Sequence, residues 1–108
     1  MIERMTHAEH AAIARSRRRS IILEGALRFA ERDGWHAIQQ KRVADEAGVS
    51  KGLVTHEFGS MGGLKTAMME EAVARFMPKI VAAGLAEGHP VAQAAPAALR
   101  EAAARSIA

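Results

Sequence analysis

The sequence predicts an all-α protein built around a helical domain at its N-terminal side. No segment alternates apolar and polar side chains as a half-buried strand would, and the chain holds only three Phe and one Trp. Good helix formers such as Ala, Leu, Met, Arg and Glu dominate instead. Glycine and proline fall between apolar-periodic segments, where they mark helix ends. At 108 residues we expect a single hydrophobic core.

The first helix is predicted to begin after an N-terminal arm. Residues 1–15 show no strong apolar stripe, so we expect a flexible arm that ends in basic residues. From Arg17 to Asp33 apolar residues recur at steps of three and four, which indicates one buried helix face. The inward positions of that face are Ile22, Ala26, Phe29 and Ala30. Gly34 then ends the helix.

Two short helices and a longer one follow. The first covers about residues 41–47, and Gly48 and Val49 make the turn after it. Ser50 can cap a helix over residues 51–58, whose inward side chains are Val54 and Phe58. Ser60 can cap the next helix, over residues 61–77. This order predicts three packed helices and a fourth that links them to the rest.

The C-terminal segment is expected to dock weakly. Residues 79–87 have room for a two-turn helix, and half of the residues after Pro90 are Ala. Leu99, Ala103 and Ile107 form a thin apolar stripe there. Because alanine favours helix but offers little area to bury, and Pro96 interrupts, we expect a short Ala-rich helical tail with partial disorder.

Composition and motifs exclude several classes of function. There is no Cys, and no nucleophile has a base at a recognisable spacing, so we expect a non-enzyme without a cofactor. His7 and His10 lie three residues apart but lack a third ligand, so no metal site is expected. No apolar run approaches the roughly 18 residues of a membrane span, and no leader is evident. We therefore expect a soluble cytoplasmic protein that does not bind membranes.

The charge distribution suits a polyanionic partner. Residues 1–65 hold 11 Lys and Arg against 8 Asp and Glu, whereas residues 66–108 hold 4 against 4. The whole excess of positive charge therefore lies in the N-terminal part, where a nucleic acid would be bound.

The spacing of small and apolar residues between positions 43 and 54 fits a helix-turn-helix. Ala44 is small where two helices would cross, and Gly48 makes the turn four residues later. Val43, Val49 and Val54 then lock the two helices together. Such a pair can place its second helix in the major groove of DNA, although a purely structural helical corner remains the alternative.

Three stretches of the chain resemble the N-terminal DNA-binding domain of TetR-family transcriptional repressors. They are ILEGALRFAERDGW, RVADEAGVSKGLVTHEF and GSMGGL, which lie within the run from Arg19 to Phe76. The resemblance implies a DNA-binding domain over residues 16–76, with its motif at 39–58. It also implies that residues 77–108 are a short remnant of the C-terminal ligand domain.

The resemblance and the chemistry of the side chains define a candidate DNA-binding surface. A recognition helix from Ser50 to Phe58 would lie in the major groove, and Ser50 belongs to its surface. The residues expected nearest to base edges are Gly52, Leu53, Thr55 and His56. The residues expected at phosphates are Arg17, Arg19, Gln39, Lys41 and Lys51. Double-stranded DNA is therefore the expected partner, bound by a regulator that represses by occupying its operator.

Departures from the family pattern keep an alternative open. Thr55 and Glu57 stand where relatives usually carry larger groups, and we expect the carboxylate of Glu57 to oppose phosphates. Relatives open the fourth helix with Lys-Glu-Glu, where this chain has residues 61–63, Met-Gly-Gly. The segment after that helix is short for a dimer interface or an inducer pocket, so no inducer is expected. The alternative is a truncated helical module that pairs through its Met-rich fourth helix, as a homodimer or with a related chain, and binds DNA weakly or not at all by itself.

Overall fold

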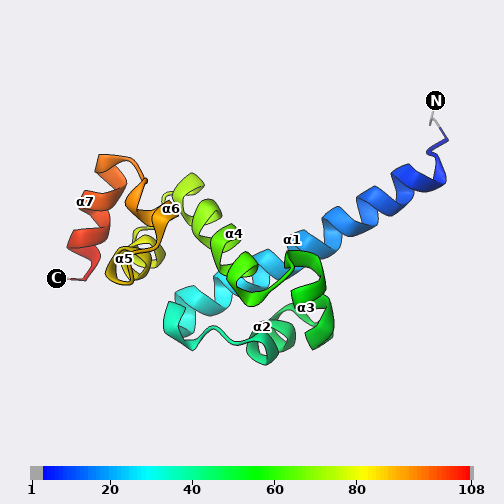
Figure 1. Cartoon of the computed structure of the whole chain (residues 1–108), viewed down its shortest axis with the longest axis horizontal. Helices are drawn as coiled ribbons and strands as arrows, with labels where there is room; N and C mark the ends of the chain where they lie inside the picture. The colour runs from blue at the N-terminus through cyan, green and yellow to red at the C-terminus, as the bar shows by residue number, and fades with distance from the viewer. Residues whose placement is uncertain (1–3, 108) are drawn as a thin grey trace.

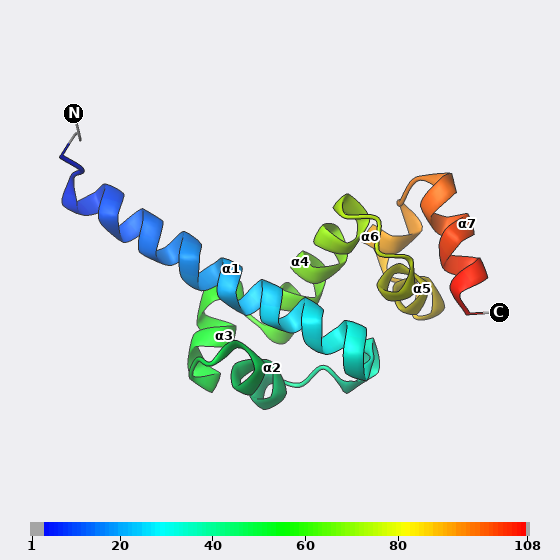
Figure 2. The same ribbon diagram turned by 180° about the vertical axis from the view of Figure 1, so that it is seen from behind.

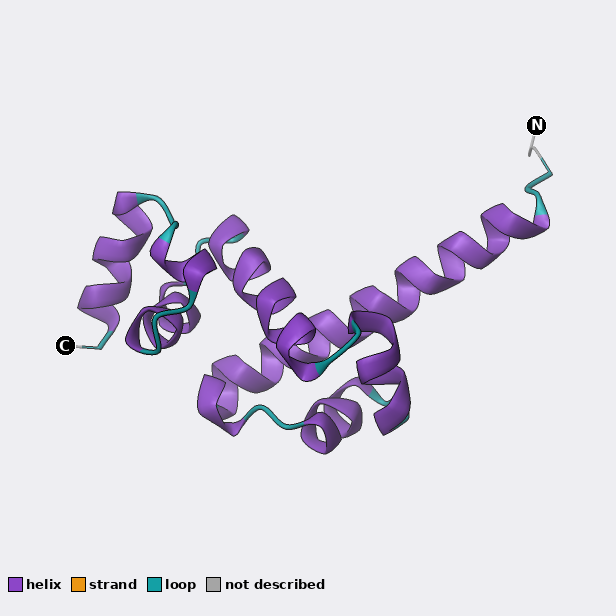
Figure 3. Cartoon of the chain, viewed as in Figure 1, coloured by secondary structure: helices purple, strands orange, loops and turns teal. Residues whose placement is uncertain are grey.

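Helix α1 runs from His7 to Asp33 and is the longest element of the structure, a computed structural model that describes residues 4–107. Its N-terminal half extends past every other helix, as Figure 1 shows. The remaining described elements are η1 (Trp35–Ala37), α2 (Gln40–Ala47), α3 (Lys51–Phe58), α4 (Met61–Ala74), α5 (Pro78–Ala86), α6 (Pro90–Gln93) and α7 (Ala97–Ser106). All secondary structure within residues 4–107 is helical, which confirms the all-α prediction (Figure 3).

The prediction of a flexible N-terminal arm was wrong for residues 7–15, which belong to α1. Thr6 caps the helix, because its hydroxyl oxygen accepts a hydrogen bond from the Glu9 amide at 3.1 Å. The same hydroxyl donates to the Glu9 carboxylate, also at 3.1 Å. This local capping and four alanines between positions 8 and 14 favour helix without any buried stripe. Residues 1–3 of the expected arm lie outside the described residues.

The first helices pack closely because small residues stand where they cross. A Cβ added at Gly25 of α1 would lie 3.0 Å from the Cβ of Ala47 in α2. Ile22, Val43 and Val54 are completely buried between α1, α2 and α3. This core fixes the orientation of α3 relative to α1, and the bounds of α3 agree with the predicted helix over residues 51–58.

Glycine also governs the packing at the start of α4. A Cβ at Gly63 would lie 2.1 Å from the carbonyl oxygen of Phe58, far closer than atoms can approach. Ser60 caps α4 by accepting a hydrogen bond from the Gly63 amide at 2.9 Å. The helix ends at Ala74, before the expected Met77, because Phe76 takes a left-handed backbone conformation with φ of 54°.

The Ala-rich tail docks on α5, contrary to the expected weak docking. Leu99 and Ala103 of α7 are 1% and 0% exposed, and Figure 2 shows α7 beside α5. Alanine side chains let the two helix backbones come close together, which compensates for the small area that each one buries. Ile107, the last residue of the predicted stripe, is 75% exposed and takes no part in this packing.

Trp35 connects the N-terminal helices to the C-terminal ones. Its buried indole N–H donates to a carboxylate oxygen of Glu87, just after α5, at 3.0 Å. The edge of the His89 ring lies against it, with ring centroids 6.4 Å apart. The Lys65 ammonium from α4 lies 5.8 Å from the indole centroid. The junction between α1 and α2 is therefore in contact with both α4 and the end of α5.

Candidate nucleic-acid interface

The α2–α3 pair has the geometry of a helix-turn-helix. Gly48 takes the left-handed conformation, with φ of 71° and ψ of 34°, and reverses the chain after α2. The Val49 amide donates to the Ala44 carbonyl at 3.0 Å, which closes the turn. Ser50 then caps α3, because its hydroxyl oxygen accepts a hydrogen bond from the Leu53 amide at 3.3 Å.

Gln40, which the sequence prediction missed, ties the start of α2 to α3. Its side-chain amide donates to the Lys51 carbonyl at 2.9 Å and to the Thr55 hydroxyl at 3.2 Å. The Thr55 hydroxyl in turn lies 3.4 Å from the Gly52 carbonyl, to which it donates. The Thr55 hydroxyl is thus occupied within the protein.

The N-terminal turn of α3 is open to solvent. Lys51, Gly52 and His56 are exposed, and a Cβ added at Gly52 would meet no atom within 4 Å. Leu53 is half-buried and packs partly against the core. Of the four residues expected at base edges, Gly52 and His56 are therefore exposed, whereas Leu53 and Thr55 present only part of their surface.

Gln39, the N-cap of α2, and Lys41, in its first turn, are both exposed. The Gln39 side chain makes no capping hydrogen bond to its own helix and is exposed. The Lys41 ammonium lies 3.1 Å from the Asp45 carboxylate, but both side chains are largely exposed, at 76% and 68%. Such a surface pair is worth little and can exchange for a phosphate.

Glu57 faces α1 and is largely withdrawn from solvent. The exposed fraction of its side chain is 9%, and a carboxylate oxygen lies 3.1 Å from Nε of Arg18 in α1. Beside this ion pair, the guanidinium of Arg19 lies 4.4 Å from the centroid of the Phe58 ring. The departure from the family pattern at Glu57 therefore has a structural cause, since Arg18 and Arg19 together hold α1 against the last turn of α3.

The structure does not bring Arg17 to the same side as the other predicted residues. Successive helix residues turn by about 100°, so Arg17 and Arg19 lie on opposite sides of Arg18. Arg19 and Arg18 contact α3, which places Arg17 on the side of α1 that points away from α3. Arg15, three residues before Arg18, lies on the α3 side and is exposed.

Carboxylates near the interface are paired with cations elsewhere on the domain. Glu46 of α2 accepts hydrogen bonds from Arg32 at 2.7 Å and from Arg28 at 3.5 Å. The hydrogen bond from Arg32 holds the pKa of Glu46 below its usual range. Lys51, in contrast, has no carboxylate within ion-pair distance in the described part of the chain, so its charge remains available to an anion.

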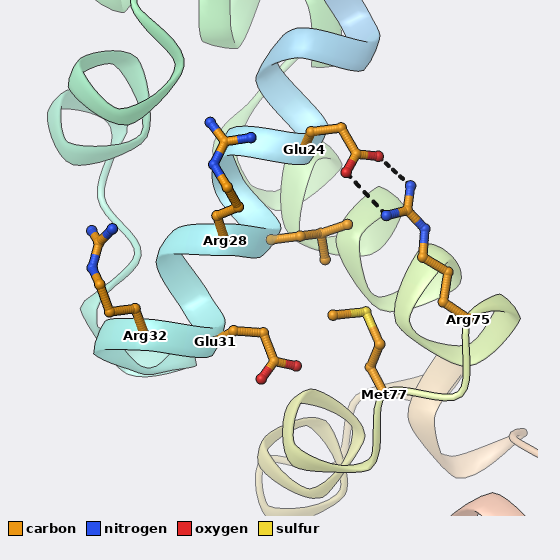
Figure 4. Close-up of a pocket in the computed structure, with 7 residues that line it drawn as sticks. Glu24, Arg28, Glu31, Arg32, Arg75 and Met77 are labelled. Atoms are coloured by element: carbon orange, nitrogen blue, oxygen red, sulfur yellow. Dashed lines mark hydrogen bonds and ion pairs between the residues drawn. The ribbon is translucent and has the colours of Figure 1, made fainter.

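A charged groove of about 470 Å³ lies between α1 and the segment that follows α4. Figure 4 shows Arg75, at the end of α4, reaching Glu24 of α1 through both guanidinium ends. That hydrogen bonding lowers the pKa of Glu24. Arg75 also donates to Glu71 at 2.7 Å, while Leu27 and Met77 line the groove with apolar surface. The groove is thus closed at one end by an ion-pair network that fixes α4 to α1.

Comparison with known proteins finds one similarity, which lies within these helices. Residues 22–68 match the family of bacterial regulatory proteins described as the tetR family. The match begins at Ile22, the first buried residue of α1, and ends at Met68 in α4, so it contains the whole helix-turn-helix. Neither a curated protein nor a solved structure matches the chain. Among the described residues, no helix is long and apolar enough to cross a membrane.

Proposed function

We propose that the chain is a regulator of the tetR family, which its residues 22–68 resemble, and that it represses transcription by placing α3 in the major groove of an operator. The observation that carries this proposal is the N-terminal turn of α3. It exposes an ammonium at Lys51 and a side-chain-free backbone at Gly52, on a helix held by Ser50 and Gln40. The proposal includes a cytoplasmic location, the compartment that holds bacterial DNA.

Each exposed group has a role that its chemistry suits. Lys51, Lys41 and Gln39 would donate to phosphates and set the register of the protein on the duplex. Gly52 would let the helix backbone come close to the base edges, and His56 would supply a ring N–H as a donor. The exposed parts of Leu53 and Thr55 would contact thymine methyl groups. Ser50 would reach a phosphate only if its capping bond can be shared.

The experiment begins with selection of duplexes from a random pool, followed by anisotropy measurements on the enriched site. Gly52→Ala should weaken binding at least about tenfold, because the added methyl group separates the backbone from the bases. The same change should raise the free energy of unfolding by roughly 0.5–1 kcal/mol, since the site is open and alanine favours helix. A loss of affinity in a variant of equal or higher stability would thus report on the interface alone.

Lys51→Ala provides a second arm of this experiment, with Arg105→Ala on α7 as its charge-matched control. Lys51→Ala should weaken binding to all duplexes alike and flatten the log–log salt dependence by about 0.9 per lost phosphate contact. Arg105→Ala should change neither quantity. An absence of any enriched sequence, together with unchanged affinity in Gly52→Ala and Lys51→Ala, would reject DNA recognition by α3.

A second candidate function is pairing with another chain, favoured by an apolar groove between α5 and α7. The groove measures about 310 Å³ and is lined by Ala82, Leu85, Ala86, Ala103, Ala104 and Ile107. Met68 and Met69 of α4 are completely buried, which removes the Met-rich surface expected to mediate such pairing. We therefore place homodimerisation, or pairing with a related chain, at the exposed Ile107 instead.

Solution mass measurements test this second candidate. If the α5–α7 groove pairs two copies, the chain should sediment as a dimer, and Ile107→Ser should shift it toward monomer. Ile21→Ser, which removes another exposed isoleucine on α1, should leave the mass unchanged. A monomer at concentrations near 100 µM, far above useful regulatory concentrations, would reject homodimerisation through this groove and leave only a related chain as partner.

A further inference from the structure

The N-terminal half of α1 is a helix without a partner in the described chain. No residue between Arg4 and Ile21 is buried, and the first buried side chain of α1 is Ile22. Figures 1 and 2 show this half projecting beyond α2, α3 and α4 from both directions of view. Eleven residues, 7–17, precede the first contact with α3, and at 1.5 Å per residue they span about 16 Å.

The direction of this projecting helix is fixed relative to α3. Arg18 forms its ion pair with Glu57 at 3.1 Å, and Arg19 lies 4.4 Å above the Phe58 ring. Both contacts are made to the last turn of α3, directly where α1 leaves the body of the protein. The helix therefore points in one defined direction from the recognition helix instead of swinging freely.

The side of the projecting helix that faces in the α3 direction carries one arginine and no carboxylate. Counting back from Arg18 in helical steps, Arg15, Ala11 and His7 fall on this side, and all three belong to turns that lack buried side chains. We call His7, Ala11 and Arg15 the arm surface. Between His10 and Leu23 the sequence has four arginines and no carboxylate. Glu9 lies on the opposite side of the helix, where its carboxylate accepts a hydrogen bond from the Thr6 hydroxyl.

We propose that the arm surface binds the phosphate backbone of the DNA that flanks the site held by α3, an inference that rests on the proposed function. Charge complementarity selects this partner, because Arg15 is exposed and forms no ion pair within residues 4–107. A helix about 10–12 Å wide does not enter a minor groove of about 6 Å. The one arginine of the arm surface would instead bind phosphate, a contact that carries no sequence preference. The length of about 16 Å corresponds to roughly five base pairs at 3.4 Å each.

The experiment compares two duplexes that carry the same selected site, one with two flanking base pairs on each side and one with eight. The chain should bind the longer duplex several-fold more tightly at low salt. Arg15→Gln should abolish this gain and lower the log–log salt slope on the long duplex by about 0.9, the value for one phosphate. Glutamine keeps the helix propensity of arginine, so the arm itself stays folded.

Two control variants remove the same charge from other places. Arg17→Gln changes the opposite side of the same helix, and Arg105→Gln changes α7 at the far end of the molecule (Figure 1). Both should keep the gain from long flanks. Equal losses in Arg15→Gln and Arg17→Gln would overturn the assignment of the arm surface, and so would equal affinity of the unaltered chain for both duplexes.

The failure of this inference is distinguishable from the failure of the proposed function. If flank length has no effect while Gly52→Ala still weakens binding, the arm inference alone is overturned. If Gly52→Ala and Lys51→Ala have no effect on any selected duplex, the role of α3 is overturned as well. A chain shortened to begin at Ser16 adds a last check. If it forms a smaller oligomer than the full chain does, the arm mediates protein pairing, and the DNA contact is overturned.

Discussion

The two ends of α3 differ in what their side chains contact. At the N-terminal end, Lys51 and Gly52 are exposed, and the Gly52 Cα has open space beside it. At the C-terminal end, two turns later, Glu57 and Phe58 are held by arginines of α1, and the Phe58 carbonyl touches Gly63 of α4. The N-terminal end of this eight-residue helix is thus open to a ligand, whereas its C-terminal end packs against α1 and α4. Substitutions at the N-terminal end should therefore alter DNA affinity, and substitutions at the C-terminal end should alter stability.

The largest effect is expected at the fixed end, from Gly63→Ala. The added Cβ would lie 2.1 Å from a backbone oxygen, so α4 must move away from α3. We expect the free energy of unfolding to fall by about 3 kcal/mol, the upper range for overpacking. Urea denaturation measures it, and Gly62→Ala is the matched control.

Gly62 is the neighbouring glycine of the same helix turn, and its added Cβ would lie 3.6 Å from the Ser60 hydroxyl, an ordinary contact. Gly62→Ala should therefore leave stability unchanged or raise it by roughly 0.5–1 kcal/mol through helix propensity. Equal denaturation midpoints for the two alanine variants would contradict the close approach of α3 and α4.

A smaller effect is expected from Glu57→Gln, which removes the charge facing Arg18 but keeps the shape of the side chain. Because Arg18 is 41% exposed and water can solvate it, the expected loss of stability is about 1 kcal/mol. The affinity for a selected duplex should change less than about twofold at a temperature where the variant is folded. Tighter binding by tenfold or more would show that the carboxylate does oppose phosphates, as the sequence alone suggested.

The smallest expected effect is a loss of stability in acid, and it arises from carboxylates outside α3. Hydrogen bonds from Arg32 and Arg75 lower the pKa of Glu46 and of Glu24. A lowered pKa in the folded state contributes stability above the ordinary carboxylate pKa, and this contribution is lost as pH falls through the lowered value. Stability should therefore decrease modestly between about pH 5 and pH 3.

Denaturation midpoints in urea measured across that pH range provide the check. The double variant Glu24→Gln with Glu46→Gln should show a flatter dependence on pH. Glu70→Gln, at an exposed carboxylate without an ion pair in the described chain, should keep the original dependence. Identical pH dependence in the double variant and the unaltered chain would contradict the assigned ion pairs.

Local signals in the sequence were sufficient to predict the bounds of α3. Ser50 before the helix and Gly59 after it mark its ends, and Val54 lies on its inner side, so its bounds of 51–58 could be predicted. The turn at Gly48 could be predicted for the same reason, since only glycine adopts that conformation without strain. These features depend on neighbours within four residues.

Contacts between distant residues were not predictable in this way. Glu57 looked unfavourable because its partner Arg18 lies 39 residues away in the chain. Gly63 looked like a missing functional group, whereas it permits an approach to Phe58 that no pattern in the sequence reveals. The prediction for the tail was wrong because burial of Leu99 depends on the surface that α5 presents. The helix over residues 7–15 was not predicted, because helix propensity and a Thr6 cap are sufficient to form it without a buried face.

The fluorescence of Trp35 can be used to follow the contact between the N-terminal and C-terminal helices. The chain has one tryptophan, and it lies where η1, α4 and the end of α5 meet. Its emission spectrum therefore describes one junction and no other place in the molecule. If the C-terminal helices separate from α1–α4 before any helix unfolds, the emission of Trp35 will shift to longer wavelength while the far-UV circular dichroism of the chain persists. Emission and circular dichroism, recorded together, thus distinguish detachment of the two parts from unfolding of their helices.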